Sequence, residues 1–152
     1  MSVILGLNAF HGDSSACLIV DGKLVTAAEE ERFRRIKHWA GFPSESISSC
    51  LSENNLTLKD VDVIAINSNP KANLRQKLGF SLSSFSGVNE AFDRLKAARK
   101  SKGIEDFLAE SFGEGQFSGE IKHIEHHHAH LASAHCVSPY DESITISVDG
   151  LG

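Results

Sequence analysis

Residues 3–28 read VILGLNAFHGDSSACLIVDGKLVTAA, and this stretch decides the fold of the chain. Three apolar runs within it predict strands, from Val3 to Phe10, from Ala16 to Val20 and from Leu24 to Ala28. Asp21 and Gly22 supply a two-residue hairpin turn between the second and third runs. The chain is therefore predicted to begin as an antiparallel meander of three strands.

Beyond the meander, helical and strand patterns alternate. Ser44 is expected to cap a helix. Residues 69–120 differ from the rest of the chain in composition, and we interpret them as an insertion of two amphipathic helices. These helices either pack on the sheet or form an exposed lid. The other elements are expected at residues 44–55 (helix), 61–66 (strand), 121–125 (strand), 125–136 (helix) and 143–152 (strand). This order fits an α/β layer with a mixed sheet.

Composition narrows the class of protein. A chain of 152 residues with 41% hydrophobic residues suits one domain. The net charge of -5 argues against nucleic acid as a partner, because neutralising phosphates needs a basic face. The three cysteines are odd in number and lack a CxxC spacing, so a reducing compartment is favoured. With no apolar run long enough to cross a bilayer, a cytoplasmic protein is expected.

Five of the eight histidines lie in residues 126–135, and two of them have the spacing of metal ligands. His126 and His130 are four residues apart, so a helix would place their side chains one turn apart on one face. The segment from Ser143 onward alternates as a strand that ends at Asp149, and a carboxylate there would project into the cleft beside the sheet. We expect these three side chains to bind one divalent metal. The HxxxH lacks the glutamate of a zinc protease, and a solvated histidine-rich turn is the alternative.

Several motifs along the chain together resemble the O-carbamoyltransferases of nodulation-factor and antibiotic biosynthesis. They are residues 11–16 (HGDSSA), 20–22 (VDG), 29–33 (EEERF), 37–38 (KH), 125–134 (EHHxAHxASA), 138–139 (SP) and 148–152 (VDGxG). The resemblance implies a ribonuclease-H-like fold, as in the actin, heat-shock and sugar-kinase superfamily. It also implies that residues 1–152 are the first lobe of an N-terminal carbamoyl-transfer domain, with the insertion at about 69–120 and the rest of the protein absent.

The chemistry implied by the resemblance is carbamoyl transfer to a hydroxyl. Carbamoyl phosphate and ATP give a carbamoyl-adenylate, and the carbamoyl group passes to a hydroxylated small-molecule acceptor that the sequence does not identify. By motif match, His126, His130 and Asp149 are the metal ligands. Histidine and carboxylate ligands together suit iron(II), manganese or zinc, and spacing does not separate these metals; iron(II) is the metal expected first.

The remaining site residues are also assigned by motif. His11 is the expected general base, although Gly12 separates it from Asp13, where relatives commonly have aspartate directly after histidine. Lys37 is expected to contact nucleotide. Gly150 and Gly152 would let backbone amides approach the phosphate.

Local pairings and rival functions complete the expectations. Glu30 and Arg34 are spaced to pair on a helix, and Arg32 and Arg35 are interpreted as structural partners of the neighbouring acids. Two rival functions are a relative of the tRNA threonylcarbamoyl-transfer family, against which residues 29–38 argue, and a non-catalytic metal- or nucleotide-binding module. The oligomeric state is not evident from the sequence.

Overall fold

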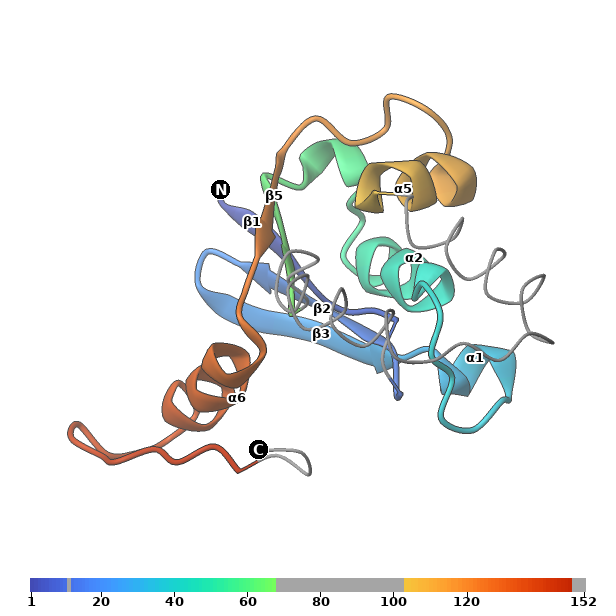
Figure 1. Ribbon diagram of the computed structural model, residues 1–152. Coiled ribbons are helices and arrows are strands. Elements are labelled where there is room, and N and C mark those ends of the chain that lie inside the picture. Colours follow the sequence, from blue (N-terminus) through green and yellow to red (C-terminus); the bar gives the residue numbers. More distant parts are fainter. Residues whose placement is uncertain (11, 68–102, 149–152) are drawn as a thin grey trace, which may run out of the picture.

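The computed structural model describes residues 1–10, 12–67 and 103–148. Within these residues a five-stranded mixed sheet has the order β3-β2-β1-β4-β5 (Figure 1). The strands are β1 (Val3–Asn8), β2 (Ser15–Val20), β3 (Lys23–Glu29), β4 (Val63–Ile66) and β5 (Glu120–His123). The first three are antiparallel neighbours, whereas β1, β4 and β5 are parallel. This is the predicted meander extended into the predicted ribonuclease-H-like sheet.

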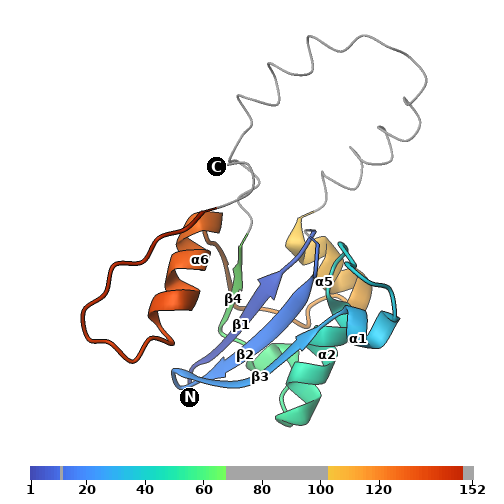
Figure 2. The ribbon, with the colours of Figure 1, turned by 90° about the horizontal axis from the view of Figure 1, so that it is seen from below.

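The helices are α1 (Glu31–Arg34), α2 (Ser44–Glu53), the 3-10 turn η1 (Leu58–Asp60), α5 (Ile104–Phe112) and α6 (His126–His135). Helices α2 and α5 lie on one side of the sheet and α6 lies on the other (Figures 1 and 2). The helix of the insertion that the structure describes, α5, buries Ile104 and Leu108 in the core, so it packs on the sheet and is not a lid. The helix expected around residues 88–95 lies outside the described residues.

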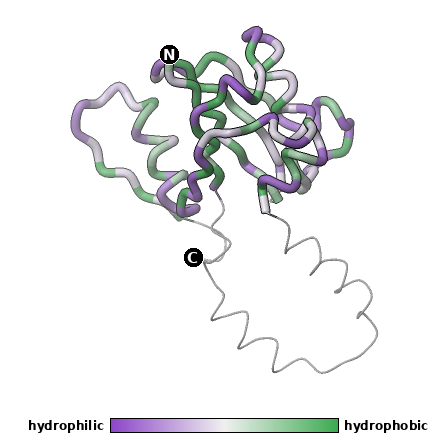
Figure 3. The backbone as a smooth tube through the Cα atoms, turned by 90° about the horizontal axis from the view of Figure 1, so that it is seen from above, coloured by the Kyte–Doolittle hydropathy of each residue, from purple (hydrophilic) through white to green (hydrophobic). Residues whose placement is uncertain are grey.

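The hydrophobic core lies between the sheet and the helices α2 and α5. Alternation along β1 and β2 sends one set of side chains into it, because successive strand residues point to opposite faces. The buried apolar residues are Val3, Leu5, Leu7, Ala9, Ala16, Leu18, Phe42, Ile47, Cys50, Leu51, Leu58, Val61, Ile64, Ile66, Ile104 and Leu108. Figure 3 shows the hydrophobic positions concentrated in the strands and the hydrophilic ones in the surrounding turns.

Turn geometry explains where β1 and the hairpin end. The first strand stops at Asn8, short of the predicted Phe10, because Phe10 adopts a left-handed backbone with φ of 64° that cannot continue a strand. Asp21 and Gly22 both have positive φ, 47° and 79°, which is the conformation that a tight two-residue hairpin requires.

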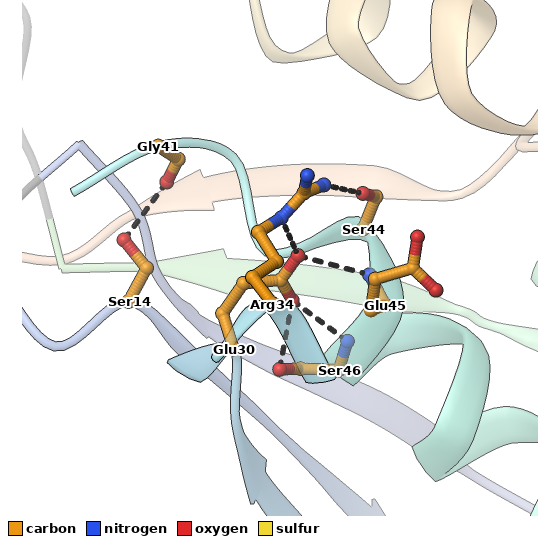
Figure 4. Close-up of polar contacts among 7 residues, drawn as sticks. All are labelled: Ser14, Glu30, Arg34, Gly41, Ser44, Glu45 and Ser46. Carbon is orange, nitrogen blue, oxygen red and sulfur yellow. Dashed lines mark hydrogen bonds and ion pairs between the residues drawn. The ribbon is translucent and has the colours of Figure 1, made fainter. Parts of the chain in front are cut away.

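The start of α2 differs from the prediction. Ser44 is the first residue of the helix and not its N-cap. Pro43 occupies the N-cap position, and its side chain makes no capping hydrogen bond. Instead the buried carboxylate of Glu30 accepts the backbone N–H groups of Glu45, at 3.2 Å, and Ser46, at 2.8 Å (Figure 4). A long-range acid thus does what a local serine was expected to do.

The arginines were also only partly predicted correctly. Arg34 pairs with Glu30 as expected, with 2.7 Å between Arg34 Nε and Glu30 Oε1. Arg32 and Arg35, in contrast, make no ion pair within the described part of the chain. The reason is that α1 is a single turn that ends at Arg35, whose backbone is left-handed, so only Arg34 lies one turn from Glu30.

The strand expected at residues 143–152 is not formed in the part that the structure describes, residues 143–148. Its apolar side chains, Ile144, Ile146 and Val148, are 92%, 78% and 89% exposed. No described strand pairs with this segment, and a lone extended segment leaves its backbone groups to water. The alternating pattern therefore predicted a strand where the described residues 143–148 form none. In the described residues no helix is long and apolar enough to cross a membrane.

Candidate functional site

Helix α6 carries the histidine pair and begins where the sequence predicts. Glu125 is its N-cap, with extended backbone, and Glu125 Oε2 accepts the backbone N–H of His128 at 2.9 Å. These hydrogen bonds, from His128 foremost and also from His127, lower the pKa of the Glu125 carboxyl, because they favour its ionised form. The cap fixes the first turn of the helix and with it the direction of His126.

His126 and His130 converge as the four-residue spacing predicts. Their Nε2 atoms are 3.1 Å apart, and their ring centroids are separated by 4.5 Å with the rings nearly perpendicular. Two nitrogens that each bind one ion at about 2.1 Å and at a right angle would be separated by about 3.0 Å. The two nitrogens are close enough to share a hydrogen bond, as they do here, and close enough to serve as two ligands of one ion, for which imidazole suits iron, manganese or zinc.

The other predicted ligands and phosphate contacts cannot be placed beside this pair. Asp149, Gly150 and Gly152 lie outside the described residues. Within the described ranges, no group of three histidine, cysteine, aspartate or glutamate side chains is arranged to bind a metal. The structure thus brings together the two histidines, and the carboxylate ligand stays a prediction.

Two other histidines of α6 contact the segment that follows the helix. His127 Nδ1 is 3.4 Å from Ser147 Oγ, and His135 Nδ1 is 3.1 Å from Ser143 Oγ. These contacts connect α6 to residues 143–148, and the ring of His127 also lies edge-on to that of His126, with 5.7 Å between centroids.

The loop between β1 and β2 is ordered by asparagine side chains. Asn8 Nδ2 donates to the carbonyl of Asp13 at 2.9 Å, and Asn67 Nδ2 donates to Asn8 Oδ1 at 2.9 Å. Asn8 is the last residue of β1 and Asn67 directly follows the parallel strand β4, so both lie at the sheet edge where ligands of such sheets bind. His11, the predicted base, belongs to this loop and lies outside the described residues.

The structure adds a contact that sequence reasoning missed. Asp13 Oδ1 is 2.8 Å from His38 Nδ1, which joins the β1–β2 loop to the turn after α1. The hydrogen bond and the negative charge of Asp13 raise the pKa of His38. The two residues belong to separate sequence motifs, and their separation of 25 residues gave no signal that they meet. Lys37, beside them, is exposed and has no ion pair within the described residues.

A buried network holds this turn in place, as Figure 4 shows. Glu30 is completely buried and accepts hydrogen bonds from Arg34 Nε, Ser46 Oγ and the two amides of α2. Ser14 Oγ donates to the carbonyl of Gly41 at 2.8 Å. Both ends of the segment that carries Lys37 and His38 are therefore fixed to the sheet and to α2.

A cavity of about 650 Å³ lies between the sheet and α6 and is lined by residues of both. Its floor is a row of small residues in register across four strands, Ala27, Cys17, Gly6 and Ala65. Polar groups of Asn8, Ser15, Glu29, Arg32 and Asn67 border it, and Ala129 of α6 lines it too. Small side chains keep this face hollow, which gives a ligand room beside the histidine helix.

A second cavity, of about 590 Å³, is aromatic. It is lined by Phe10, Trp39, Ala40, Gly41, Phe42, Phe107 and Glu110. The rings of Phe10 and Phe107 have centroids 4.9 Å apart, and those of Phe42 and Phe107 are 5.6 Å apart. The buried indole nitrogen of Trp39 has no hydrogen-bond partner among the described residues. The cavity thus has a largely aromatic wall.

The fold and the site define a ribonuclease-H-like lobe with a histidine pair and ligand-sized cavities at its sheet. Comparison with known proteins makes the class specific. Residues 3–152 match the family described as "Carbamoyltransferase N-terminus", and the chain belongs to this family. The family predicted from the sequence motifs is thereby confirmed.

Two curated relatives extend over nearly the whole chain. The uncharacterized protein sll1178 of Synechocystis is 37% identical over 161 residues, covering 100% of this chain and 26% of its own length. The nodulation protein NolNO of Sinorhizobium fredii is 33% identical over 145 residues, covering 95% of this chain and 20% of its own length. The chain thus spans about a quarter or less of these relatives. Among solved structures, YeaZ from Pseudomonas aeruginosa is similar with a TM-score of 0.41 and 18% identity, covering 82% of this chain and 43% of that one.

Proposed function

We propose that the protein to which this chain belongs transfers a carbamoyl group from a carbamoyl-adenylate to a hydroxyl of a small-molecule acceptor. The observation that carries the proposal is the family match across residues 3–152, together with the relationship to the nodulation protein NolNO. Carbamoyl phosphate and ATP are the co-substrates from which the adenylate is made. The chain supplies the first lobe of the domain in which the transfer takes place, and the use of ATP suits a cytoplasmic reaction.

The histidine pair supports a metal-assisted reaction. His126 and His130 have the separation expected of two ligands of one ion, and Asp149 is the proposed third. The bound ion would lower the charge on the phosphate of the leaving group, and iron(II) is the metal we favour, ahead of manganese and zinc. The chain's own part is to hold the two imidazoles in one geometry, which the Glu125 cap and the helix backbone do.

Other groups of the chain are proposed to contact the nucleotide. Lys37 presents an ammonium group at the surface next to the β1–β2 loop, where it can pair with a phosphate. Gly150 and Gly152 would let backbone amides approach the same phosphate. His11, in the β1–β2 loop, is the base that the sequence predicts.

Metal analysis of the intact protein tests the site directly. We expect about one equivalent of metal in the unmodified protein and loss of that metal in both His126→Ala and His130→Ala. His128→Ala is the matched control, because its side chain lies on the same helix and only its backbone N–H, which alanine retains, contacts Glu125. Retention of the metal in both ligand variants would refute the assignment.

Activity of the intact protein tests the reaction class. With ATP, carbamoyl phosphate and a panel of hydroxylated acceptors, we expect pyrophosphate release and a product whose mass has increased by one carbamoyl group. Formation of an adenylate without carbamoylation of any acceptor would contradict the proposed transfer. Binding of metal and ATP without either reaction would instead indicate a binding module.

A further inference from the structure

The contact between Asp13 and His38 has the geometry of an oriented acid–base pair. Asp13 Oδ1 lies 2.8 Å from His38 Nδ1, which places the Nδ1 proton in the hydrogen bond and leaves the lone pair on Nε2. Nε2 makes no hydrogen bond within the described residues. Both side chains are well exposed, at 66% for His38 and 57% for Asp13, so Nε2 is accessible to a ligand.

An exposed ion pair alone is weak evidence, because many such pairs contribute little. This pair differs in that the backbones on both sides are held in uncommon conformations. Asp13 has φ of 61° and His38 has φ of 55°, in the left-handed region that residues with side chains seldom adopt. Residues held in this way tend to cluster at functional sites.

Buried contacts keep the two loops together. Ser14 N donates to the carbonyl of Trp39 at 2.9 Å, and Phe10 N donates to the carbonyl of Gly41 at 3.2 Å. Glu30 N in turn donates to the carbonyl of Ser14 at 2.9 Å. The loops that carry Asp13 and His38 are therefore connected directly by backbone hydrogen bonds, and the pair is preorganised.

Charged neighbours act on His38 in one direction. Asp13 raises its pKa by hydrogen bonding and by its charge, and the carboxylate of Glu31, which accepts the backbone N–H of His38 at 3.2 Å, adds to the rise. Lys37 is the adjacent cation in the chain. A carboxylate that accepts the Nδ1 proton makes Nε2 of the neutral ring a stronger base, which suits a general base.

The aromatic cavity borders the same loops. Phe10 precedes Asp13 in the β1–β2 loop, Trp39 directly follows His38, and both line the cavity. Apolar pockets with few polar groups are typical of small-molecule sites, and aromatic walls suit the apolar faces of a hydroxylated ring.

We propose that His38, oriented by Asp13, takes the proton of the acceptor hydroxyl during carbamoyl transfer, and that the acceptor is a hydroxylated ring held in the aromatic cavity. This inference rests on the proposed function and assigns to His38 the role that the sequence predicts for His11. The hydroxyl oxygen forms a bond to the carbamoyl carbon as its proton passes to His38 Nε2. The bond from that carbon to the phosphate oxygen breaks, and its electron pair leaves with AMP. Asp13 is a positioning residue.

The pairing itself is tested by carbethoxylation of the intact protein with diethyl pyrocarbonate, which reacts with neutral imidazole. Cleavage after Lys37 releases residues 38–59, in which His38 is the sole histidine, so its modification can be followed by mass spectrometry. We expect the pH midpoint of modification at His38 to be lower in Asp13→Asn than in the unmodified protein. An unchanged midpoint would show that the pair does not form, and would overturn the proposal.

The catalytic role is tested by separating the two reactions in the intact protein. Pyrophosphate release from ATP and carbamoyl phosphate measures adenylate formation, and carbamoylation of glycerol, N-acetylglucosamine or kanamycin measures transfer. We expect His38→Gln to reduce transfer by roughly 100-fold or more while adenylate formation is unchanged. Asp13→Asn should reduce transfer less, and His135→Gln, an exposed histidine outside this site, should leave both rates unchanged.

The outcomes distinguish this inference from the proposed function. If His38→Gln leaves transfer unaffected, or reduces transfer and adenylate formation equally, the role of His38 is overturned. If His11→Ala loses transfer and His38→Gln does not, the role of base returns to His11. If the unmodified protein forms the adenylate but carbamoylates no hydroxyl, the proposed function fails, and the role of His38 fails with it.

Discussion

Arg34 and Glu30 form an ion pair across one helical turn, with 2.7 Å between Arg34 Nε and Glu30 Oε1, but only the arginine reaches solvent. The side chain of Arg34 is 32% exposed, whereas that of Glu30 is fully buried and also caps α2. Arg34 further lies over the ring of Trp39, with 4.7 Å from its guanidinium carbon to the ring centroid. The acid therefore connects the turn after β3 to α2, and the arginine covers it.

Replacing the two partners should have unequal effects on stability. Glu30→Ala leaves the amides of Glu45 and Ser46 and the Ser46 hydroxyl without their buried acceptor, and we expect it to lower the free energy of unfolding by about 3 kcal/mol. Arg34→Ala should lower the free energy of unfolding by only about 1 kcal/mol, because water can reach the space that the arginine side chain leaves. Urea denaturation measures both, with the exposed neighbour Glu29→Ala as control. Equal losses would contradict the dominant role of the carboxylate.

A side chain at position 119 is expected to destabilise the protein. A Cβ there would meet the carbonyl oxygens of Asp62 and Val61, the latter at 2.7 Å, where β5 begins beside β4. Gly119→Ala should therefore destabilise the protein by about 1–3 kcal/mol, because backbone atoms cannot move aside cheaply. Gly12→Ala is the control for thermal denaturation, because a Cβ at Gly12 has nothing within 4 Å. A similar effect of both substitutions would count against the close approach of the strands.

The cysteines should differ sharply in reactivity. Cys136 is exposed and Cys50 is buried, with Cys50 Sγ directed at the carbonyl of Ala16 at 3.6 Å. Burial, aided by the neighbouring Cys17 and Glu53, raises the pKa of Cys50 to about 11, so its thiolate is scarce at pH 8. Iodoacetamide at pH 8 is expected to label Cys136 rapidly and Cys50 only after denaturation, as followed by peptide mass spectrometry. Equal labelling rates for the two thiols would mean that Cys50 is not buried between α2 and the sheet.

The stability of the first turn of α6 should fall at acid pH, because Glu125 caps that turn. Its pKa is lowered in the fold by the backbone N–H groups it accepts, so its contribution to helix stability is complete above the unfolded pKa and is lost as pH falls through the folded pKa. Amide exchange at His128, corrected for the intrinsic pH dependence, should show protection that is lost only at a pH below the usual titration range of a glutamate carboxyl. Glu125→Gln should weaken this acid-dependent change, whereas the exposed Glu142→Gln should retain it. A profile identical in all three proteins would exclude the cap as its cause.

Local sequence patterns predicted the elements that need only short-range information. The apolar runs of residues 3–28 and the Asp21-Gly22 turn are sufficient for a meander, because strand pairing across a two-residue turn is a local event. The helical face of Ile47, Cys50 and Leu51 is buried as its periodicity indicates. The spacing of His126 and His130 also predicted their convergence, since helix geometry alone sets it.

The failures arose where a partner comes from elsewhere in the chain. Ser44 has the identity of a helix cap, but Glu30 occupies that role from fifteen or more residues away. The alternation of Ile144, Ile146 and Val148 has the form of a strand, but a strand forms only against a neighbour. Asp13 and His38 belong to separate sequence motifs 25 residues apart, and nothing local indicates that they meet.

The order of amino acids by itself determined the meander and the turn-by-turn geometry of the histidine helix, because each depends on residues within a few positions of one another, and the motifs spread along the chain together predicted the family. Only the tertiary structure decided that Asp13 orients His38 and that Glu30 starts α2. It also placed small residues from four strands in one row to leave a cavity. Such arrangements depend on strand register and on buried hydrogen bonds between distant segments, whose energies become favourable only when the whole lobe has packed.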